Sequence, residues 1–500
     1  MTGVNDMRPP TRRDFLTTLG FGAASLALPR TLRGAPARKP NILFILVDDM
    51  GWRDVGFMGS TYYETPNIDR LASQGIVFTN AYANGPNCAP TRACLMSGQY
   101  SPRHGVYTVG NSDRGSAKHR KLIPIKNTTT LRKDIVTIAE ALKPAGYVSA
   151  SMGKWHLGSP PEAGPIGQGF DVNVAGNASG SPRGGYFSPY RNPQLPNGPE
   201  GEYLTDRLTE EAVKFIEANK DRHWFLYLPH YAVHTPIQAK KALTAKYAAK
   251  KPSGGQGNPK YAAMIESVDQ GVGRLLSTLD RLGIADDTIV IFYSDNGGVG
   301  GYRACGVIGG EITSNAPLKG GKGMLYEGGI REPCAIRWPR RVKPGKCHVP
   351  IITTDFYPTL LEIAGAKPPD QPLDGESIVP LLTGKGTLKR DAIYWHFPCY
   401  LQGGGGTWRT TPGSVIRMGD WKLIEFFEDG RLELYNLKDD IGETANLVEK
   451  MPGKARELHG RLVAWRKALN APVPTEPNPQ YDPNAPKGGG GKRRRPSKKG

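Results

Sequence analysis

The sequence predicts an α/β protein with a large, mostly parallel sheet flanked by helices, followed by a smaller antiparallel sheet with one helix. Three observations support this prediction. Short apolar runs recur along the chain, as strands buried on both faces require. Amphipathic helical segments separate these runs. From about residue 391, short strand-like segments joined by tight turns replace the alternation.

The first predicted strand is Asn41–Val47, which is apolar almost throughout and ends in the pair Asp48-Asp49. Thr65–Gly75 follows as a helix, with a threonine suited to the N-cap, a proline in the first turn and a terminal glycine. The chain therefore opens with a buried strand that places two carboxylates at its carboxyl end.

The next segment, Asn87–Gly98, contains Cys88, Pro90 and Arg92. Proline is favoured at the first helical position, so we expect a helix that begins near Pro90 with Cys88 just before it. Backbone N–H groups at a helix start attract anions, and an arginine adds a fixed positive charge beside them. A buried cysteine beside a helix start is the alternative interpretation of this short pattern.

The remaining elements of the large sheet alternate in type. The predicted helices are Asp134–Lys143, Thr205–Ala218 and Tyr261–Leu282, and the predicted strands are Tyr147–Met152, Trp224–Leu228 and Thr288–Tyr293. Residues 173–201 are rich in Gly, Pro, Ser and Asn and predict a long surface loop. The smaller sheet is predicted from Ser414–Arg417, Trp421–Phe427 and Leu432–Tyr435, and the helix after it from Lys454–Leu469.

Polar clusters follow four predicted strands, and the carboxyl edge of a parallel sheet is where sites form. Asp48, Asp49, Asp295 and Asn296 supply three carboxylates and an amide oxygen, which suit calcium or magnesium. A turn or helix cap would explain either pair alone. Two such pairs, each after a buried strand, favour a metal site.

The other two clusters contain lysine and histidine. Lys154 and His156 lie in a glycine-bounded turn where both could face the site. Flanking prolines argue against a helix at His230 and His234, and no glutamate follows His230 as a zinc-protease motif requires. We therefore expect His234 in the site and a structural role for His230. Lys322 lies in a glycine-rich loop that lacks the order of residues in a P-loop.

Charge and cysteine content limit the possible functions. The net charge of the 500 residues is +19, of which +5 lies in residues 1–39 and +7 in residues 487–500. The remaining excess is mild, which suits an anionic substrate and argues against nucleic acid as a partner. The six cysteines show no Cys-x-x-Cys spacing. Residues 471–500 are rich in Pro, Gly and basic residues and are expected to form a disordered basic tail.

The N-terminus resembles a twin-arginine export signal over residues 1–37. Arg12-Arg13 precedes Phe15-Leu16, an apolar stretch follows, and Ala35-Pro-Ala37 offers small residues for cleavage. The apolar stretch is too short to span a membrane stably. We therefore expect the twin-arginine translocase as a partner and a periplasmic or secreted protein. A chance Arg-Arg pair before a core helix is the alternative.

Several motifs together resemble those of the type I, formylglycine-dependent sulfatases of the alkaline phosphatase superfamily. They are, in order, Asp48-Asp49, Cys88-Ala-Pro-Thr-Arg92 with Leu95-Met-Ser-Gly98, Gly153-Lys-Trp-His-Leu-Gly158, His234-Thr-Pro236, Ser294-Asp-Asn-Gly-Gly298 and Lys322-Gly-Met-Leu-Tyr-Glu-Gly-Gly-Ile-Arg-Glu-Pro333. The joint pattern is similar to the arylsulfatase and N-acetylgalactosamine-6-sulfatase group. It implies an alkaline phosphatase-like catalytic domain over residues 38–390 and an α+β subdomain over 391–470.

The resemblance also implies a mechanism. A formylglycine-generating maturation enzyme would oxidise Cys88 to an aldehyde, whose hydrate attacks sulfur. Calcium would be bound by Asp48, Asp49, Asp295 and Asn296, together with modified Cys88. Arg92 would stabilise the hydrate, and Lys154 and Lys322 would bind sulfate oxygens. His234 would protonate the leaving alcohol, and His156 would take a proton so that sulfate is expelled.

The expected substrate is a sulfated sugar, a sulfated polysaccharide or an aryl sulfate. Residues 173–201 and 395–412, including His396 and the run Gly403–Gly406, are expected to form the rim of the substrate pocket. Two alternatives remain open: a phosphate or phosphonate monoester hydrolase of the same superfamily, and an inactive protein that binds sulfated glycans. The residues alone predict only hydrolysis or transfer on an anionic ester beside a divalent cation.

Overall fold

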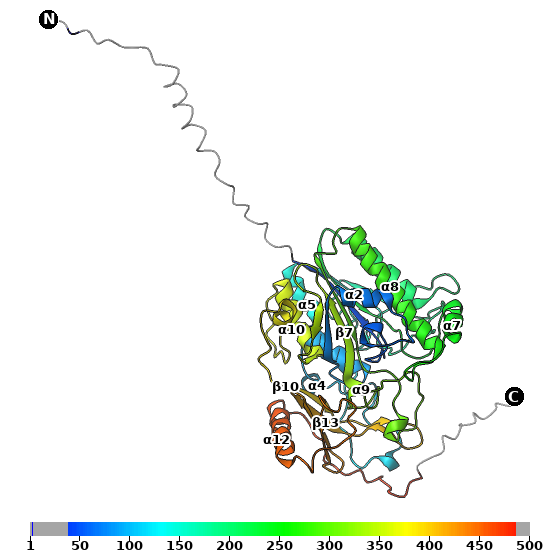
Figure 1. Ribbon diagram of the computed structural model, residues 1–500, viewed down its shortest axis with the longest axis vertical. Helices are drawn as coiled ribbons and strands as arrows, with labels where there is room; N and C mark the ends of the chain where they lie inside the picture. The colour runs from blue at the N-terminus through cyan, green and yellow to red at the C-terminus, as the bar shows by residue number, and fades with distance from the viewer. Residues whose placement is uncertain (1–2, 4–38, 487–500) are drawn as a thin grey trace, which may run out of the picture. The chain divides into compact units, whose positions relative to one another are not determined.

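A computed structural model describes Gly3 and residues 39–486 of the chain (Figure 1). Apart from Gly3, the predicted export signal over residues 1–37 lies outside the described residues, as do residues 487–500. No helix in residues 39–486 is long and apolar enough to cross a membrane.

The core of the protein is a nine-stranded sheet with the order β4-β3-β5-β1-β6-β7-β2-β8, in which β9 also pairs with β2. The strands are β1 (Asn41–Val47), β2 (Ile76–Tyr82), β3 (Tyr147–Met152), β4 (Val172–Val174), β5 (His223–Pro229), β6 (Thr288–Ser294), β7 (Arg331–Arg337), β8 (Gly345–Cys347) and β9 (Ile351–Ile352). β7 runs antiparallel to both of its neighbours, and the other pairs are parallel. The predicted mostly parallel sheet is confirmed.

Helices cover both faces of this sheet because its central strands are apolar on both faces. The helices are α2 (Pro66–Ser73), α3 (Cys88–Ser97), α4 (Ser101–His104), α5 (Ile138–Leu142), α6 (Leu204–Ala218), α7 (Lys241–Ala248), α8 (Pro259–Arg281), α9 (Glu327–Ile330), α10 (Phe356–Ala364), α11 (Val379–Thr383) and α12 (Pro452–Ala468). Leu43 and Ile45 of β1 pack in one core with α2, α6 and α8. Phe44 and Leu46 pack in the other with α3, α5 and α10. Figure 1 shows α5 and α10 on one side of the sheet and α2 and α8 on the other.

The C-terminal part contains the predicted antiparallel sheet, with the order β10-β13-β14-β15. Its strands are β10 (Ala392–Phe397), β13 (Gly413–Met418), β14 (Trp421–Phe426) and β15 (Leu432–Asn436), and a hairpin of β11 (Leu401–Gln402) and β12 (Trp408–Thr410) lies between β10 and β13 in the sequence. Helix α12 packs Leu458 and Leu462 against one face. The other face contributes Trp395 and Ile424 to a core shared with Tyr82 of β2.

Several predicted boundaries differ from the structure, and two of them are helix starts near the site and the sheet. Helix α3 begins at Cys88 rather than near Pro90, because Asn87 is the extended residue before it. A proline in the first turn costs no helical hydrogen bond, so it marks that turn without fixing which of its residues comes first. Helix α5 begins at Ile138, since Thr137 and Glu140 form a capping box that sets its start.

The tail expected to be disordered from residue 471 is ordered up to residue 486. Ile123 donates its N–H to the Glu476 carbonyl at 2.9 Å, and Asn478 donates to the Lys121 carbonyl at 2.9 Å. These backbone bonds attach the segment along residues 118–123. Composition predicted disorder here because it does not reveal partners that lie far away in the sequence.

Candidate active site

The carboxyl ends of β1 and β6 bring together the first part of the site. Val47 pairs with Ser294 in parallel register, so Asp48 and Asp295 leave the sheet side by side. Asp295 donates its N–H to the Val47 carbonyl at 3.1 Å, and Asp49 donates its N–H to Oδ1 of Asp295 at 3.2 Å. Asp49 has a φ of 63°, a left-handed conformation that turns its carboxylate back into the cluster.

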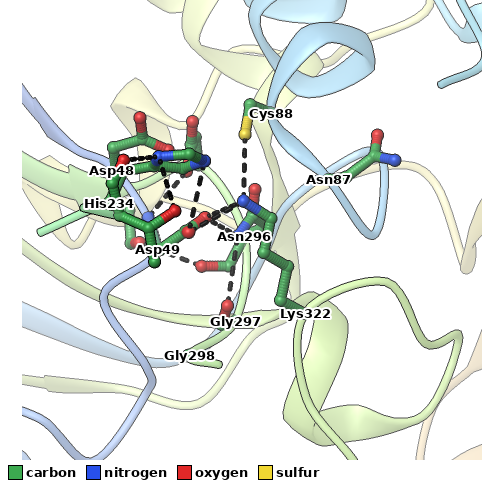
Figure 2. Close-up of polar contacts among 12 residues, drawn as sticks. Asp48, Asp49, Asn87, Cys88, His234, Asn296, Gly297, Gly298 and Lys322 are labelled. Carbon is green, nitrogen blue, oxygen red and sulfur yellow. Dashed lines mark hydrogen bonds and ion pairs between the residues drawn. The ribbon is translucent and has the colours of Figure 1, made fainter. Parts of the chain in front are cut away.

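Ligand atoms of Asp48, Asp49, Asp295 and Cys88 all lie within 4.8 Å of one another, and all four residues are buried. Figure 2 shows Asp48 and Asp49 of this cluster near Cys88. Asn296 donates to Oδ1 of Asp49 at 2.9 Å. The structure therefore gathers the four predicted metal ligands around the predicted nucleophile.

Three cations surround these carboxylates: Arg92 and Lys154 are fully buried, and the side chain of Lys322 is 12% exposed. Nζ of Lys154 lies 2.5 Å from Asp48, and Nζ of Lys322 lies 2.5 Å from Asp49. Arg92 donates from Nε at 3.0 Å and from Nη2 at 2.7 Å to Oδ2 of Asp295. Paired charges are the condition under which so many ionised groups can be buried together.

The oxygen atoms of this cluster suit a hard divalent cation. Oδ1 of Asp48 and Oδ1 of Asn296 are buried and have no hydrogen-bond partner among the described residues. An unpaired buried oxygen is costly, and calcium and magnesium bind carboxylate and amide oxygens. The residues present therefore fit such an ion.

Cys88 lies at the floor of the site, and only 1% of its surface is exposed. Nζ of Lys322 donates to its Sγ at 3.5 Å (Figure 2). Burial, with Asp48 as the next cause, raises the pKa of the Cys88 thiol to about 12. The thiol is therefore protonated at neutral pH and a weak nucleophile, because the reactive form of cysteine is the thiolate.

Two histidines face the same space. Nδ1 of His234 lies 2.7 Å from the Thr235 carbonyl, which requires a proton on Nδ1, and Nε2 lies 3.8 Å from Oδ2 of Asp49. Burial, followed by the charge of Lys322, lowers the pKa of His234 to about 3. Burial, followed by Lys154, also lowers the pKa of His156 well below its usual value. Both rings are neutral in this arrangement.

These groups line a cavity of about 390 Å³. Its lining residues are Asp49, Asn87, Cys88, Val109, Arg114, His156, Gly180, Ser181, His234, Thr235, Val299, Lys322, Leu401 and Arg409. The two segments predicted to form the rim each contribute, through Gly180 and Ser181 and through Leu401 and Arg409. Residues Gly403–Gly406 do not line it.

His396 was predicted at the rim, and the structure corrects this. The residue is 4% exposed, and its ring nitrogens lie 2.7 Å from Oγ of Ser414 and 2.9 Å from the Pro472 carbonyl. The pairing of β10 with β13 places His396 opposite Ser414, so its ring faces the inside of the protein. His230 is also buried, and burial lowers its pKa to about 4. It does not line the cavity, as expected for a structural residue.

The sequence analysis did not identify Arg114, and it covered Arg409 only as a member of the predicted rim segment 395–412. Neither lies in a motif or after a predicted strand, so only the folded chain reveals their convergence. With two lysines, three arginines and two neutral histidines beside a cation-binding cluster, the site has the features of a hydrolase that acts on anionic esters.

Comparisons with known proteins name the family. The model of the sulfatase family matches residues 40–366, and the model of the N-sulphoglucosamine sulphohydrolase C-terminal region matches residues 321–468. The chain belongs to the sulfatase family, and it is a sulfuric ester hydrolase.

Individual relatives agree with this assignment. A sulfatase of Formosa agariphila is 37% identical over 518 residues, covering 87% of this chain and 90% of the relative. Human N-acetylgalactosamine-6-sulfatase is 35% identical over 387 residues, which cover 72% of this chain and 69% of the relative. The solved structure of Ps i-CgsB in complex with k-i-k-neocarrahexaose is 31% identical, with a TM-score of 0.71, and covers 88% of this chain and 95% of that one.

Proposed function

We propose that this sulfatase removes sulfate from a sulfated sugar, within an oligosaccharide or polysaccharide, using formylglycine formed from Cys88 and a bound calcium ion. The observation that supports this most directly is the position of Cys88. Its side chain lies against the carboxylate cluster and Lys322, yet its thiol is held neutral. Oxidation at this position would replace an unreactive thiol by a reactive oxygen group.

The sugar substrate is supported by two of the similar proteins. One is named for a sulfated amino sugar, and one was solved with an oligosaccharide bound. A sulfated ring is also an anionic ester, which matches the cations at the cavity floor.

Asp48, Asp49, Asp295 and Asn296, together with position 88, would hold the calcium ion. When bound, the ion supplies Lewis-acid polarisation of a sulfate oxygen. Arg92 keeps the ligand set in place, because it also donates from Nη1 to the Lys154 carbonyl at 2.7 Å and so ties the ends of β3 and β6 together. At position 88, a formylglycine hydrate would provide a hydroxyl as the nucleophile toward sulfur.

The other residues bind sulfate and move protons. Lys154 and Lys322 reach the cluster with their Nζ atoms and would bind sulfate oxygens, stabilising charge in the transition state. Nε2 of His234 carries no proton in the neutral tautomer, so it must gain one before it can donate to the leaving alcohol. His156 is neutral and can accept the proton that is released when sulfate is expelled.

The cellular route is also a proposal. Arg12-Arg13 and the apolar stretch after it support export by the twin-arginine translocase to the periplasm or beyond. Because that route carries folded proteins, the maturation enzyme would act on Cys88 before export.

Mass spectrometry of the peptide that contains Cys88 tests the proposal, using protein produced in its own host. We expect the mass of the aldehyde or its hydrate, and sulfate release from sulfated sugars that is absent in a Cys88→Ser variant. Active protein with an unmodified thiol would refute the formylglycine mechanism. Faster cleavage of the phosphate ester than of the sulfate ester of the same alcohol would favour a phosphoester hydrolase.

A further inference from the structure

Two arginines on the wall of the cavity have no part in the proposed reaction. Arg114 lies in the loop after α4, and Arg409 lies on β12 of the C-terminal hairpin. Both line the same cavity as Cys88 and Lys322. Two segments almost 300 residues apart in the sequence therefore place guanidinium groups at one site.

Neither guanidinium has a carboxylate partner within residues 39–486. Arg114 donates from Nη2 to the Val109 carbonyl. The guanidinium carbon of Arg409 lies 4.5 Å from the centre of the Tyr302 ring, and its Nε is buried without a hydrogen-bond partner. The three cations around the carboxylate cluster, in contrast, are each paired with an aspartate.

The two arginines also act on each other. Burial lowers the pKa of Arg114, and the charge of Arg409 lowers it further, so the like charges lie close enough to repel. Asp49 is the one acidic residue in the cavity lining, and it is paired with Lys322. A partly buried pair of like charges without a counter-charge is unfavourable until an anion binds.

Packing fixes Arg409 beside the loop that contains Lys322. A Cβ added at Gly323 would lie 2.5 Å from Cδ2 of Leu401 and 3.0 Å from Cδ of Arg409. The ring of Tyr302 lies against the Arg409 guanidinium, and the hydroxyl of the same tyrosine donates to the Lys322 carbonyl at 2.9 Å. The hairpin therefore packs directly against the loop that contains Lys322.

We propose that Arg114 and Arg409 bind a second anionic group of the substrate, a sulfate ester or a carboxylate. This inference rests on the proposed function and narrows its substrate class to sugars with two or more negative charges. The cavity of about 390 Å³ is near the small end of ligand pockets, so the second group belongs to the sulfated sugar or to its immediate neighbour. A planar guanidinium fork matches both groups.

The first test compares substrates that differ by one anionic group. N-acetylgalactosamine 6-sulfate is compared with N-acetylgalactosamine 4,6-disulfate and with a disaccharide that joins a uronate to the monosulfated sugar. For matured wild-type enzyme we expect a higher kcat/KM for a dianionic substrate. In Arg114→Gln and Arg409→Gln this preference should fall about 10- to 100-fold, chiefly through KM, since a hydrogen bond to a charged group is lost. The substrate with the larger loss identifies sulfate or carboxylate as the second group.

Arg340→Gln is the matched control, because Arg340 is an exposed arginine remote from the cavity lining, with a side chain that is 64% exposed. It should leave the preference unchanged. An equal loss on all three substrates would indicate a structural role and overturn the inference, as would an unchanged preference in both cavity variants.

A binding measurement separates this inference from the proposed function. Calorimetry on the Cys88→Ser chain, with and without the arginine substitutions, reports affinity for the same three sugars without turnover. Tighter binding of a dianionic sugar, lost with either arginine and weakened by salt, supports the inference even if no sulfate is released. Equal affinity for all three sugars would overturn it while leaving sulfatase activity untouched.

Discussion

Replacing Lys422 by methionine should destabilise the protein strongly, because this lysine lies between two buried glutamates. Its Nζ is 2.9 Å from Glu327 and 2.8 Å from Glu443, and all three side chains are fully buried. Glu443 also accepts the Glu327 N–H at 2.7 Å. The triad joins β14 to α9, at the end of the loop that contains Lys322.

The size of the effect follows from the charges left behind. Removing one partner of a buried ion pair costs about 3–5 kcal/mol, since the remaining charge is uncompensated. Burial already raises the pKa of Glu443 to about 7, against the opposing effect of Lys422. A folded-state pKa above the unfolded value gives stability that is present at low pH and is lost as pH rises through the folded pKa. Without Lys422 that pKa rises further.

The loss should therefore grow with pH. From pH 6 to pH 8 the stability gap between variant and wild type should widen, at up to about 1.4 kcal/mol per pH unit for each extra proton that the folded variant binds. Urea unfolding at both pH values measures this gap. Lys454→Met is the control, because Lys454 forms a partly exposed pair with Glu457 that is worth under about 1 kcal/mol. A loss for Lys422→Met below 1 kcal/mol, or one independent of pH, would refute the reasoning.

Three further predictions concern the site. Lys154→Ala and Lys322→Ala should each lower kcat by about 10²–10³ or more in steady-state assays. Lys214→Ala, which changes an exposed lysine on α6, should leave kcat unchanged. Near-normal turnover in Lys154→Ala or Lys322→Ala would remove the substituted lysine from the site. Calcium at about 100 times its Kd should stabilise the protein by about 2.7 kcal/mol in thermal unfolding. A chelator should reverse this stabilisation, and the Asp295→Asn variant should not show it. An unchanged melting temperature on addition of calcium would contradict calcium binding. His396→Phe should cost about 1–3 kcal/mol for each partner left unpaired yet leave KM unchanged, and a raised KM would return His396 to the pocket.

Much of the sheet was predictable because its strands are buried on both faces. Asn41–Val47 and Tyr147–Met152 match β1 and β3 residue for residue, since a run of apolar residues closed by a charged or glycine-rich turn leaves little choice of boundary. The candidate metal ligands followed from the same logic. Asp48 and Asp295 each come directly after a buried strand, and parallel pairing brings such residues to one edge.

Other features depend on contacts that no local pattern encodes. His396 lies in a segment whose glycines predicted an exposed rim, but its strand pairing turns the ring toward Ser414. Arg409 reaches the cavity only because the separate hairpin β11–β12 packs on Gly323. The segment from residue 471 is ordered by backbone bonds to a loop about 350 residues earlier. Each of these outcomes is set by tertiary structure rather than by composition.

The hairpin β11–β12 has a consequence for how this enzyme could diversify. Groups assigned to bond breaking stand on the large sheet and on elements packed directly against it, whereas Arg409 stands on a two-stranded ribbon between β10 and β13. Changes of length or sequence in that ribbon could retune which sugars are accepted while the strand ends stay untouched. A directed-evolution library restricted to residues 401–410 would therefore explore new specificities at little risk to turnover itself.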